Sequence, residues 1–110
     1  MNTSYVRQRT GAPEAVAQGR TQITYNGRTR TARTADGVEI VEGLRVYTND
    51  LERGVIRLDR AEWEWYGSEG KYHLWFEVEV DHNYKGEPVN GERVLQSDDR
   101  VATRFEGVPA

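Results

Sequence analysis

Residues 61–80 decide the fold, and they read AEWEWYGSEGKYHLWFEVEV. Trp63 and Trp65 alternate with glutamates in the first part, and every second side chain between residues 72 and 80 is again apolar or aromatic. Alternation of this kind is typical of a β-strand with one buried face. The intervening Gly-Ser-Glu-Gly loop at residues 67–70 predicts an antiparallel hairpin.

The loop also predicts the register of this hairpin. It pairs Trp65 with Tyr72, Glu64 with His73, Trp63 with Leu74, and Glu62 with Trp75. The face opposite the core then presents a tryptophan among glutamates, which suits an Arg or Lys side chain by cation–π contact and ion pairing. We therefore expect a partner-binding face made by Trp75, Glu62, Glu64, Tyr66, His73 and Glu77, with Glu79 beside them. In the competing interpretation, the N-terminal hairpin of the same chain covers Trp75.

The rest of the chain also predicts short strands joined by turns. Asn26-Gly27 lies between β-forming residues, which is the strongest short hairpin signal because a type I′ turn needs positive φ at both positions. Asp36-Gly37 and Asn49-Asp50 predict further turns, and Pro88 with Asn90-Gly91 predicts the connection before the last strands. We expect these strands at residues 21–25, 28–33, 38–41, 44–48, 54–58, 93–96 and 101–105.

Residues 1–20 lack this alternation. Pro13 and Gly19 bracket a stretch that predicts one short helical turn in an otherwise extended arm. Together these patterns predict a mainly β protein, either a small barrel or a sandwich. The expected organisation is an arm (1–20), a basic β-hairpin (21–37), a β-barrel (38–105) and a C-terminal tail (106–110).

Several short motifs carry a family resemblance. GLRVY at residues 43–47 followed by RGVI at 53–56 resembles the opening of an SH3-like barrel of the KOW or Tudor type. With NGER at residues 90–93 and RVATRF at 100–105, the pattern is also similar to small uncharacterised proteins of actinobacteria and their phages. The resemblance implies an SH3-like barrel and a phage or prophage context.

The charge is unevenly distributed. The 110 residues carry 15 basic and 18 acidic side chains, a net charge of -3. Residues 1–35 hold six arginines and one glutamate, whereas residues 36–110 hold nine basic and 17 acidic residues. Basic residues beside an aromatic suit a nucleic-acid backbone and its bases, so an alternative binding surface is Arg20, Tyr25, Arg28, Arg30 and Arg33. The competing interpretation packs Ile23 and Tyr25 onto the acidic module, with the arginines paired to carboxylates.

Composition argues against several classes of function. There is no Cys, and the longest apolar runs have three residues, far short of the roughly 20 that span a membrane. Two histidines without a nucleophile motif or ligand spacing predict no catalytic residue, no metal site and no cofactor. We expect an intracellular or virion protein without a signal peptide.

The function expected from the sequence is a non-enzymatic interaction or assembly module, such as a phage structural or accessory protein. The basic arm would dock on the acidic face within one chain or between copies, which allows a homo-oligomer. The alternatives are a nucleic-acid-binding accessory protein and, third, a small enzyme.

Overall fold

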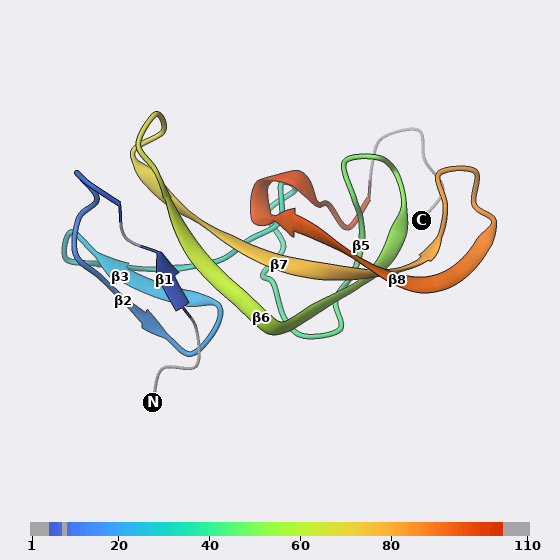
Figure 1. Cartoon of the computed structure of the whole chain (residues 1–110), viewed down its shortest axis with the longest axis horizontal. Helices are drawn as coiled ribbons and strands as arrows, with labels where there is room; N and C mark the ends of the chain where they lie inside the picture. The colour runs from blue at the N-terminus through green and yellow to red at the C-terminus, as the bar shows by residue number, and fades with distance from the viewer. Residues whose placement is uncertain (1–4, 8, 105–110) are drawn as a thin grey trace.

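The computed structural model describes residues 5–7 and 9–104, and it confirms a mainly β protein (Figure 1). Eight strands and one short 3₁₀ helix are found in the described part of the chain. They are β1 (Tyr5–Arg7), β2 (Ala15–Gln18), β3 (Gln22–Tyr25), β4 (Arg28–Thr31), β5 (Arg45–Tyr47), β6 (Arg53–Tyr66), β7 (Lys71–His82), β8 (Pro88–Ser97) and η1 (Asp98–Arg100). No helix within residues 5–7 and 9–104 is long and apolar enough to cross a membrane.

The larger sheet is built around β6. Antiparallel β7 follows one side of β6, and β8 extends the sheet beyond β7. The other side of β6 carries two short strands, with antiparallel β5 beside its first residues and parallel β1 beside Glu62 to Glu64. The long β6–β7 ribbon is therefore the frame on which the other elements are arranged, as Figure 1 shows.

The expected barrel is not closed by strand ladders in the described residues. One isolated bridge joins β5 to the segment after η1, between Tyr47 and Ala102. Its two backbone hydrogen bonds are 2.7 and 3.1 Å long. The larger sheet therefore curls so that β5 meets the segment after β8 and η1 at one point. Of the strand predicted at residues 101–105, only this bridge at Ala102 is formed in the described residues. Phe105 and the expected tail at 106–110 lie outside the described residues.

The smaller sheet contains β2, β3 and β4, and β2 corrects the prediction of a helical turn. Residues 15–18 pair antiparallel with β3 instead, which places Ala17 opposite Ile23 and buries both. Gly19, at φ 73°, turns the chain between the two strands. A six-residue helix cannot stabilise itself, whereas strand pairing gives the same residues backbone partners and an apolar contact.

The β3–β4 hairpin confirms the predicted turn and register. Asn26 and Gly27 have φ values of 51° and 74°, as the type I′ turn requires. Tyr25 pairs with Arg28, and Thr24 pairs with Thr29 across a 2.9 Å hydroxyl hydrogen bond. The turn at Asp36-Gly37 also forms, but residues 38–41 return as an isolated bridge between Arg33 and Glu39 rather than as a strand.

Two strand boundaries differ from the prediction. The expected strands 54–58 and 61–66 are one continuous strand, β6, whose pairing with β7 is interrupted between Arg57 and Glu62. Asn90-Gly91 lies inside β8, and the turn before β8 is formed around Asn83 instead. The Asn83 Oδ1 accepts hydrogen bonds from the backbone N–H groups of Lys85 and Glu87, both at 3.0 Å. An Asn side chain bonded two residues ahead is a recognised turn former.

One hydrophobic core links the two sheets. Ile23 and Tyr25 of β3 belong to the same buried cluster as Trp63, Leu74 and the rest of the β6–β7 core face. The Tyr25 ring lies 5.0 Å from the Tyr72 ring in an edge contact. This confirms that the hairpin packs on the acidic module through Ile23 and Tyr25. The expected pairing of its arginines with carboxylates is wrong, because Arg33 bonds a backbone carbonyl and Arg30 lies over the Tyr25 ring. The N-terminal hairpin and the larger sheet therefore share one core.

Candidate functional site

The outer face of the β6–β7 hairpin carries the residues singled out from the sequence. The four predicted cross-strand pairs are all present, from Trp65 opposite Tyr72 to Glu62 opposite Trp75. Strand alternation therefore gathers six predicted residues on the face opposite the core, namely Trp75, Glu62, Glu64, Tyr66, His73 and Glu77. Five of them are half-buried, whereas His73 is fully buried.

The N-terminal arm docks on this face within the same chain. Strand β1 pairs in parallel with β6, with Arg7 opposite Glu64. The Arg7 guanidinium lies 2.9 Å from Glu62 and 3.9 Å from Glu64, and Arg9 donates a 2.8 Å hydrogen bond to Glu64. The two arginine side chains are more than half exposed, so each ion pair contributes about 0–1 kcal/mol. The docked arm is therefore held by a short ladder and weak ion pairs.

The cation that was expected to contact the Trp75 ring also comes from the same chain. The Arg100 guanidinium carbon lies 5.8 Å from the centre of the Trp75 ring. The hairpin at residues 21–33 packs on the core face instead, so the interpretation that it covers Trp75 is wrong. Leu95 of β8 lies beside this tryptophan in a groove of about 220 Å³ and is 62% exposed. This groove is the part of the face that stays open.

His73 was expected on an accessible surface, and its burial is a correction. The 3₁₀ helix η1 brings Asp98 over β7, where its carboxylate bonds the His73 Nδ1 at 2.7 Å. Glu69, in the β6–β7 loop, bonds the Nε2 at 2.9 Å. Asp98 also accepts the backbone N–H of Leu74 at 3.1 Å. The imidazole is thereby held between two carboxylates.

The electrostatics of this cluster favour a structural role. Burial alone would lower the pKa of His73, but the hydrogen bonds to Glu69 and Asp98 outweigh it and raise the pKa above its usual value. Burial raises the pKa of Asp98, against the opposing bonds from Leu74 and His73. Because both ring nitrogens are engaged, His73 has no free lone pair with which to act as a general base.

One group of side chains has the composition of a cation site. Ligand atoms of Glu69, His73 and Asp99 lie within 4.8 Å of one another. Both nitrogens of His73 already bond carboxylates, so a metal ion would have to displace one of these bonds. The arrangement serves as an ion cluster that ties β7 to η1 and to the β6–β7 loop.

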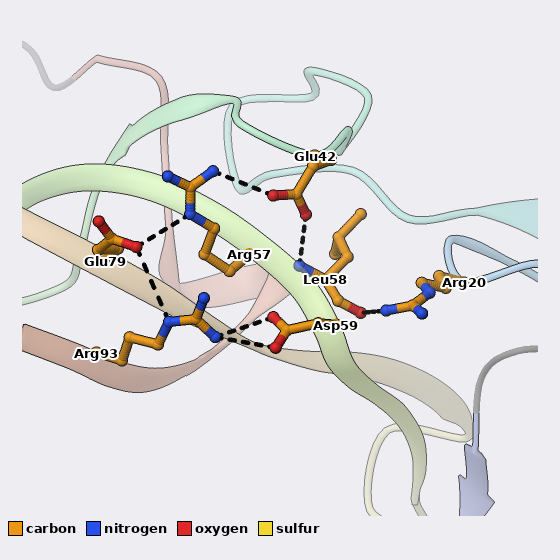
Figure 2. Close-up of a pocket in the computed structure, with 7 residues that line it drawn as sticks. All are labelled: Arg20, Glu42, Arg57, Leu58, Asp59, Glu79 and Arg93. Carbon is orange, nitrogen blue, oxygen red and sulfur yellow. Dashed lines mark hydrogen bonds and ion pairs between the residues drawn. The ribbon is translucent and has the colours of Figure 1, made fainter.

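A second charged cluster surrounds the irregular part of β6 (Figure 2). Arg57 bonds Glu79 and Glu42, both at 3.1 Å, and Arg93 bonds both oxygens of Asp59 at 2.9 and 3.1 Å. The bonds to Glu79 and Glu42 raise the pKa of the Arg57 guanidinium. A 3.0 Å hydrogen bond to Glu77, together with the bonds to Asp59, raises the pKa of the Arg93 guanidinium. Here each arginine is neutralised by carboxylates of the same chain.

The same cluster explains how the interrupted ladder is stabilised. Leu58 lies where β6 loses its pairing with β7. Its backbone N–H donates to Glu42 at 2.7 Å, and its carbonyl accepts a hydrogen bond from Arg20. Figure 2 shows both contacts. Backbone groups that leave a ladder need other partners, and these two side chains supply them. Arg20, expected in a nucleic-acid surface, has this backbone role instead.

The other residues of the expected nucleic-acid surface are not gathered on one open face. Tyr25 is 4% exposed in the core, so its ring has no free face for stacking on a base. Arg33 bonds the Gly37 carbonyl at 3.2 Å, while Arg30 lies 5.6 Å from the Tyr25 ring centre. Arg28 and Arg30 are exposed on β4, the last strand of its sheet. Nucleic-acid binding through these two residues stays a prediction.

Sequence reasoning missed the residues that complete these clusters. Arg7 and Arg9 were counted in the basic arm but not matched to Glu62 and Glu64, because parallel pairing has no local sequence signal. Asp98 lies 25 residues from His73 in the sequence, so no local pattern connects the two. The β7–β8 register, which places Ser97 opposite Trp75, brings it to His73 and Leu74.

Comparison with family models, with curated proteins and with solved structures finds no match to this chain. The resemblance to SH3-like modules and phage proteins therefore rests on the sequence motifs.

Proposed function

We propose that this protein is a non-catalytic assembly module in which the N-terminal strand β1 docks on β6, within one chain or between copies. The single observation that carries the proposal is the parallel β1–β6 pairing, reinforced by Arg7 and Arg9 on Glu62 and Glu64. Strand addition to a sheet edge is a common mode of protein recognition. A structural or accessory role in a phage particle is the biological context that the sequence resemblance implies.

The weakness of the β1–β6 contact favours exchange of β1 between copies. The ladder has only three residue pairs, and its ion pairs are exposed. The Tyr72 hydroxyl anchors the chain a few residues after β1, with a 2.7 Å hydrogen bond to the Pro13 carbonyl. Gly11, at φ 87°, lies between the anchor and β1 and supplies a hinge. Because the contacts in cis and in trans would be the same, exchange costs little beyond association entropy.

The open part of the face supports the same proposal. Leu95 is exposed beside Trp75, and β8 forms the edge of its sheet in the described residues. An exposed edge strand invites pairing with another chain. A neighbouring copy whose arm lies along β6 would lie close enough to cover this apolar edge.

The experiment is to measure molar mass against concentration by light scattering. We expect the mass to rise with concentration, and we expect Glu62→Arg and Trp75→Ala to shift the rise to higher concentration. Glu39→Arg is the matched control, because Glu39 is exposed and bridges Arg33 after the small sheet instead of lying on β6 or β7. A mass that is identical for all four proteins across the concentration range would overturn the assembly proposal.

A further inference from the structure

A cavity of about 360 Å³ lies between the β5–β6 loop and the β7–β8 loop. Its volume falls in the range of small-molecule sites. Two tyrosines, a leucine and three basic or imidazole side chains supply most of its wall, and none of its lining residues is a carboxylate. These side chains are Tyr47, Tyr84, Leu51, Arg53, Lys85 and His82. A wall without acidic groups is unusual in the acidic half of this chain.

The two permanent cations of this cavity have rings as neighbours instead of anions. The Arg53 guanidinium carbon lies 5.3 Å from the centre of the Tyr47 ring, and the Lys85 ammonium lies 5.7 Å from the centre of the Tyr84 ring. The Arg53 Nε is buried without a hydrogen-bond partner. Neither cation has an ion pair within 4 Å among the described residues, in contrast to Arg57. A buried donor without a partner is costly.

Two carboxylates next to this cavity, Asp81 and Glu87, are engaged by other side chains. Asp81 accepts two hydrogen bonds from Arg45, at 2.8 and 3.0 Å, and a third contact of 2.6 Å joins it to His82. The Arg45 hydrogen bonds hold the pKa of Asp81 at about 2. Glu87 accepts the Asn83 amide at 2.9 Å. Asp81 and Glu87 therefore do not neutralise Arg53 or Lys85, and neither cation has a carboxylate within 4 Å among the described residues.

The mouth of the cavity offers a planar apolar surface. Tyr84 is 66% exposed and Leu51 is 40% exposed. The loop that carries Tyr84 is held in place by Asn83, which bonds the backbone on both sides of the turn. An exposed tyrosine on a fixed loop can stack on an aromatic ring of a ligand.

We propose that this cavity binds a small phosphate-bearing ligand with a planar ring. The phosphate would lie between Arg53 and Lys85, and the ring would stack on Tyr84. This site is separate from the β1–β6 contact and does not depend on the assembly proposal.

The test is a titration of the isotope-labelled protein with AMP, followed by the amide signals in two-dimensional NMR. We expect shifts confined to the two loops, at Leu51, Arg53 and Tyr84 to Gly86. Adenosine and ribose 5-phosphate, which each lack one half of the ligand, should bind at least about tenfold more weakly. Phosphotyrosine in a parallel titration distinguishes an aromatic phosphate on a peptide from a nucleotide as the source of the ring.

Variants at the cavity complete the test. Lys85→Gln should weaken AMP binding about fivefold or more, and Tyr84→Ala should weaken it about threefold or more. Lys71→Gln is the matched control, because Lys71 is the other lysine and lies at the opposite end of β7. Lys85 and Tyr84 are both exposed, so these two variants keep the fold. A third variant, Arg53→Gln, changes a half-buried residue, and the test does not depend on its folding. Absence of localised shifts at about 10 mM AMP, or equal binding of AMP and inorganic phosphate, would overturn the proposal.

Discussion

Removing the charge of Asp98 is the perturbation that best tests the buried ion cluster. In Asp98→Asn, the amide oxygen can still accept the Leu74 N–H, which Asp98 bonds at 3.1 Å. The charge-assisted bond to His73, at 2.7 Å, is lost. A hydrogen bond to a charged group contributes about 1.5–3 kcal/mol. Glu69 still balances the imidazolium through Nε2, so we expect a loss of about 2 kcal/mol in the free energy of unfolding.

This loss should depend on pH, with a sign set by His73. Its pKa is raised in the folded state, by Glu69 and Asp98 against the effect of burial. The protonated imidazole therefore stabilises the fold fully below its unfolded pKa of about 6.5, and this stabilisation disappears as the pH rises through the higher folded pKa. The difference between wild type and Asp98→Asn should thus be largest near pH 6 and shrink by pH 9.

Urea unfolding followed by tryptophan fluorescence measures the effect. With a denaturant slope of about 1.5 kcal/mol/M, the midpoint should fall by roughly 1.3 M near pH 6. Asp99→Asn is the control, since Asp99 is 45% exposed and 3.9 Å from the imidazole, and it should cost about 0.5 kcal/mol. If the stability difference between wild type and Asp98→Asn stayed constant from pH 6 to pH 9, or if the two variants had equal effects, His73 would not be a protonated imidazole held by Asp98.

Two further substitutions test the packing of the frame. Gly54→Ala should destabilise the protein by about 3 kcal/mol or prevent folding, because a Cβ there would overlap the backbone carbonyl of Glu79 on β7. Thermal unfolding measures the loss, and an unchanged melting temperature would contradict the described β6–β7 contact. Tyr25→Phe should raise the free energy of unfolding by about 1 kcal/mol, because the Tyr25 hydroxyl is buried without a hydrogen-bond partner; a comparable loss of stability would mean that the hydroxyl is bonded.

Local patterns in the sequence predicted those parts of the fold that depend on neighbouring residues. The Asn26-Gly27 turn requires positive φ at both positions, so it determined both the hairpin and its register. The Gly67 to Gly70 loop likewise determined the pairs of the β6–β7 hairpin, and a slip by one residue would move Trp63 and Leu74 off their common buried face. Short-range turn chemistry and period-two alternation were sufficient for these elements.

The elements that were missed depend on partners distant in the sequence. Residues 15–18 resembled a helical turn because their strand character comes only from pairing with β3. Asn90-Gly91 resembled a turn, but it lies inside β8, where the pairing with β7 is irregular between the Val80–Glu92 and His82–Pro88 pairs. The join between the two predicted strands of β6 depends on Glu42 and Arg20, which complete the backbone bonding of Leu58.

The sequence predicted which residues form the candidate site, but it did not predict which residues surround them. Alternation placed Trp75 and the glutamates on one face, and charge complementarity indicated that the basic arm would meet them. The arginines that meet Glu62 and Glu64 are Arg7 and Arg9, whereas the hairpin arginines were expected to pair with carboxylates. No sequence pattern reports which of several cations reaches a given carboxylate, because the answer depends on how the chain folds back.

The most direct test of the central claim, that β1 docks on β6 and can do so between copies, uses a pair of charge-reversed variants. One variant carries Arg7→Glu and Arg9→Glu, and the other carries Glu62→Arg and Glu64→Arg. Each variant alone has like charges at the docking site, whereas a mixture allows each arm to meet a complementary β6. Light scattering of the equimolar mixture should give a heterodimer of twice the 12.6 kDa chain mass, while each variant alone stays monomeric. A mixture that keeps the mass of the separate variants would contradict docking of the arm between copies.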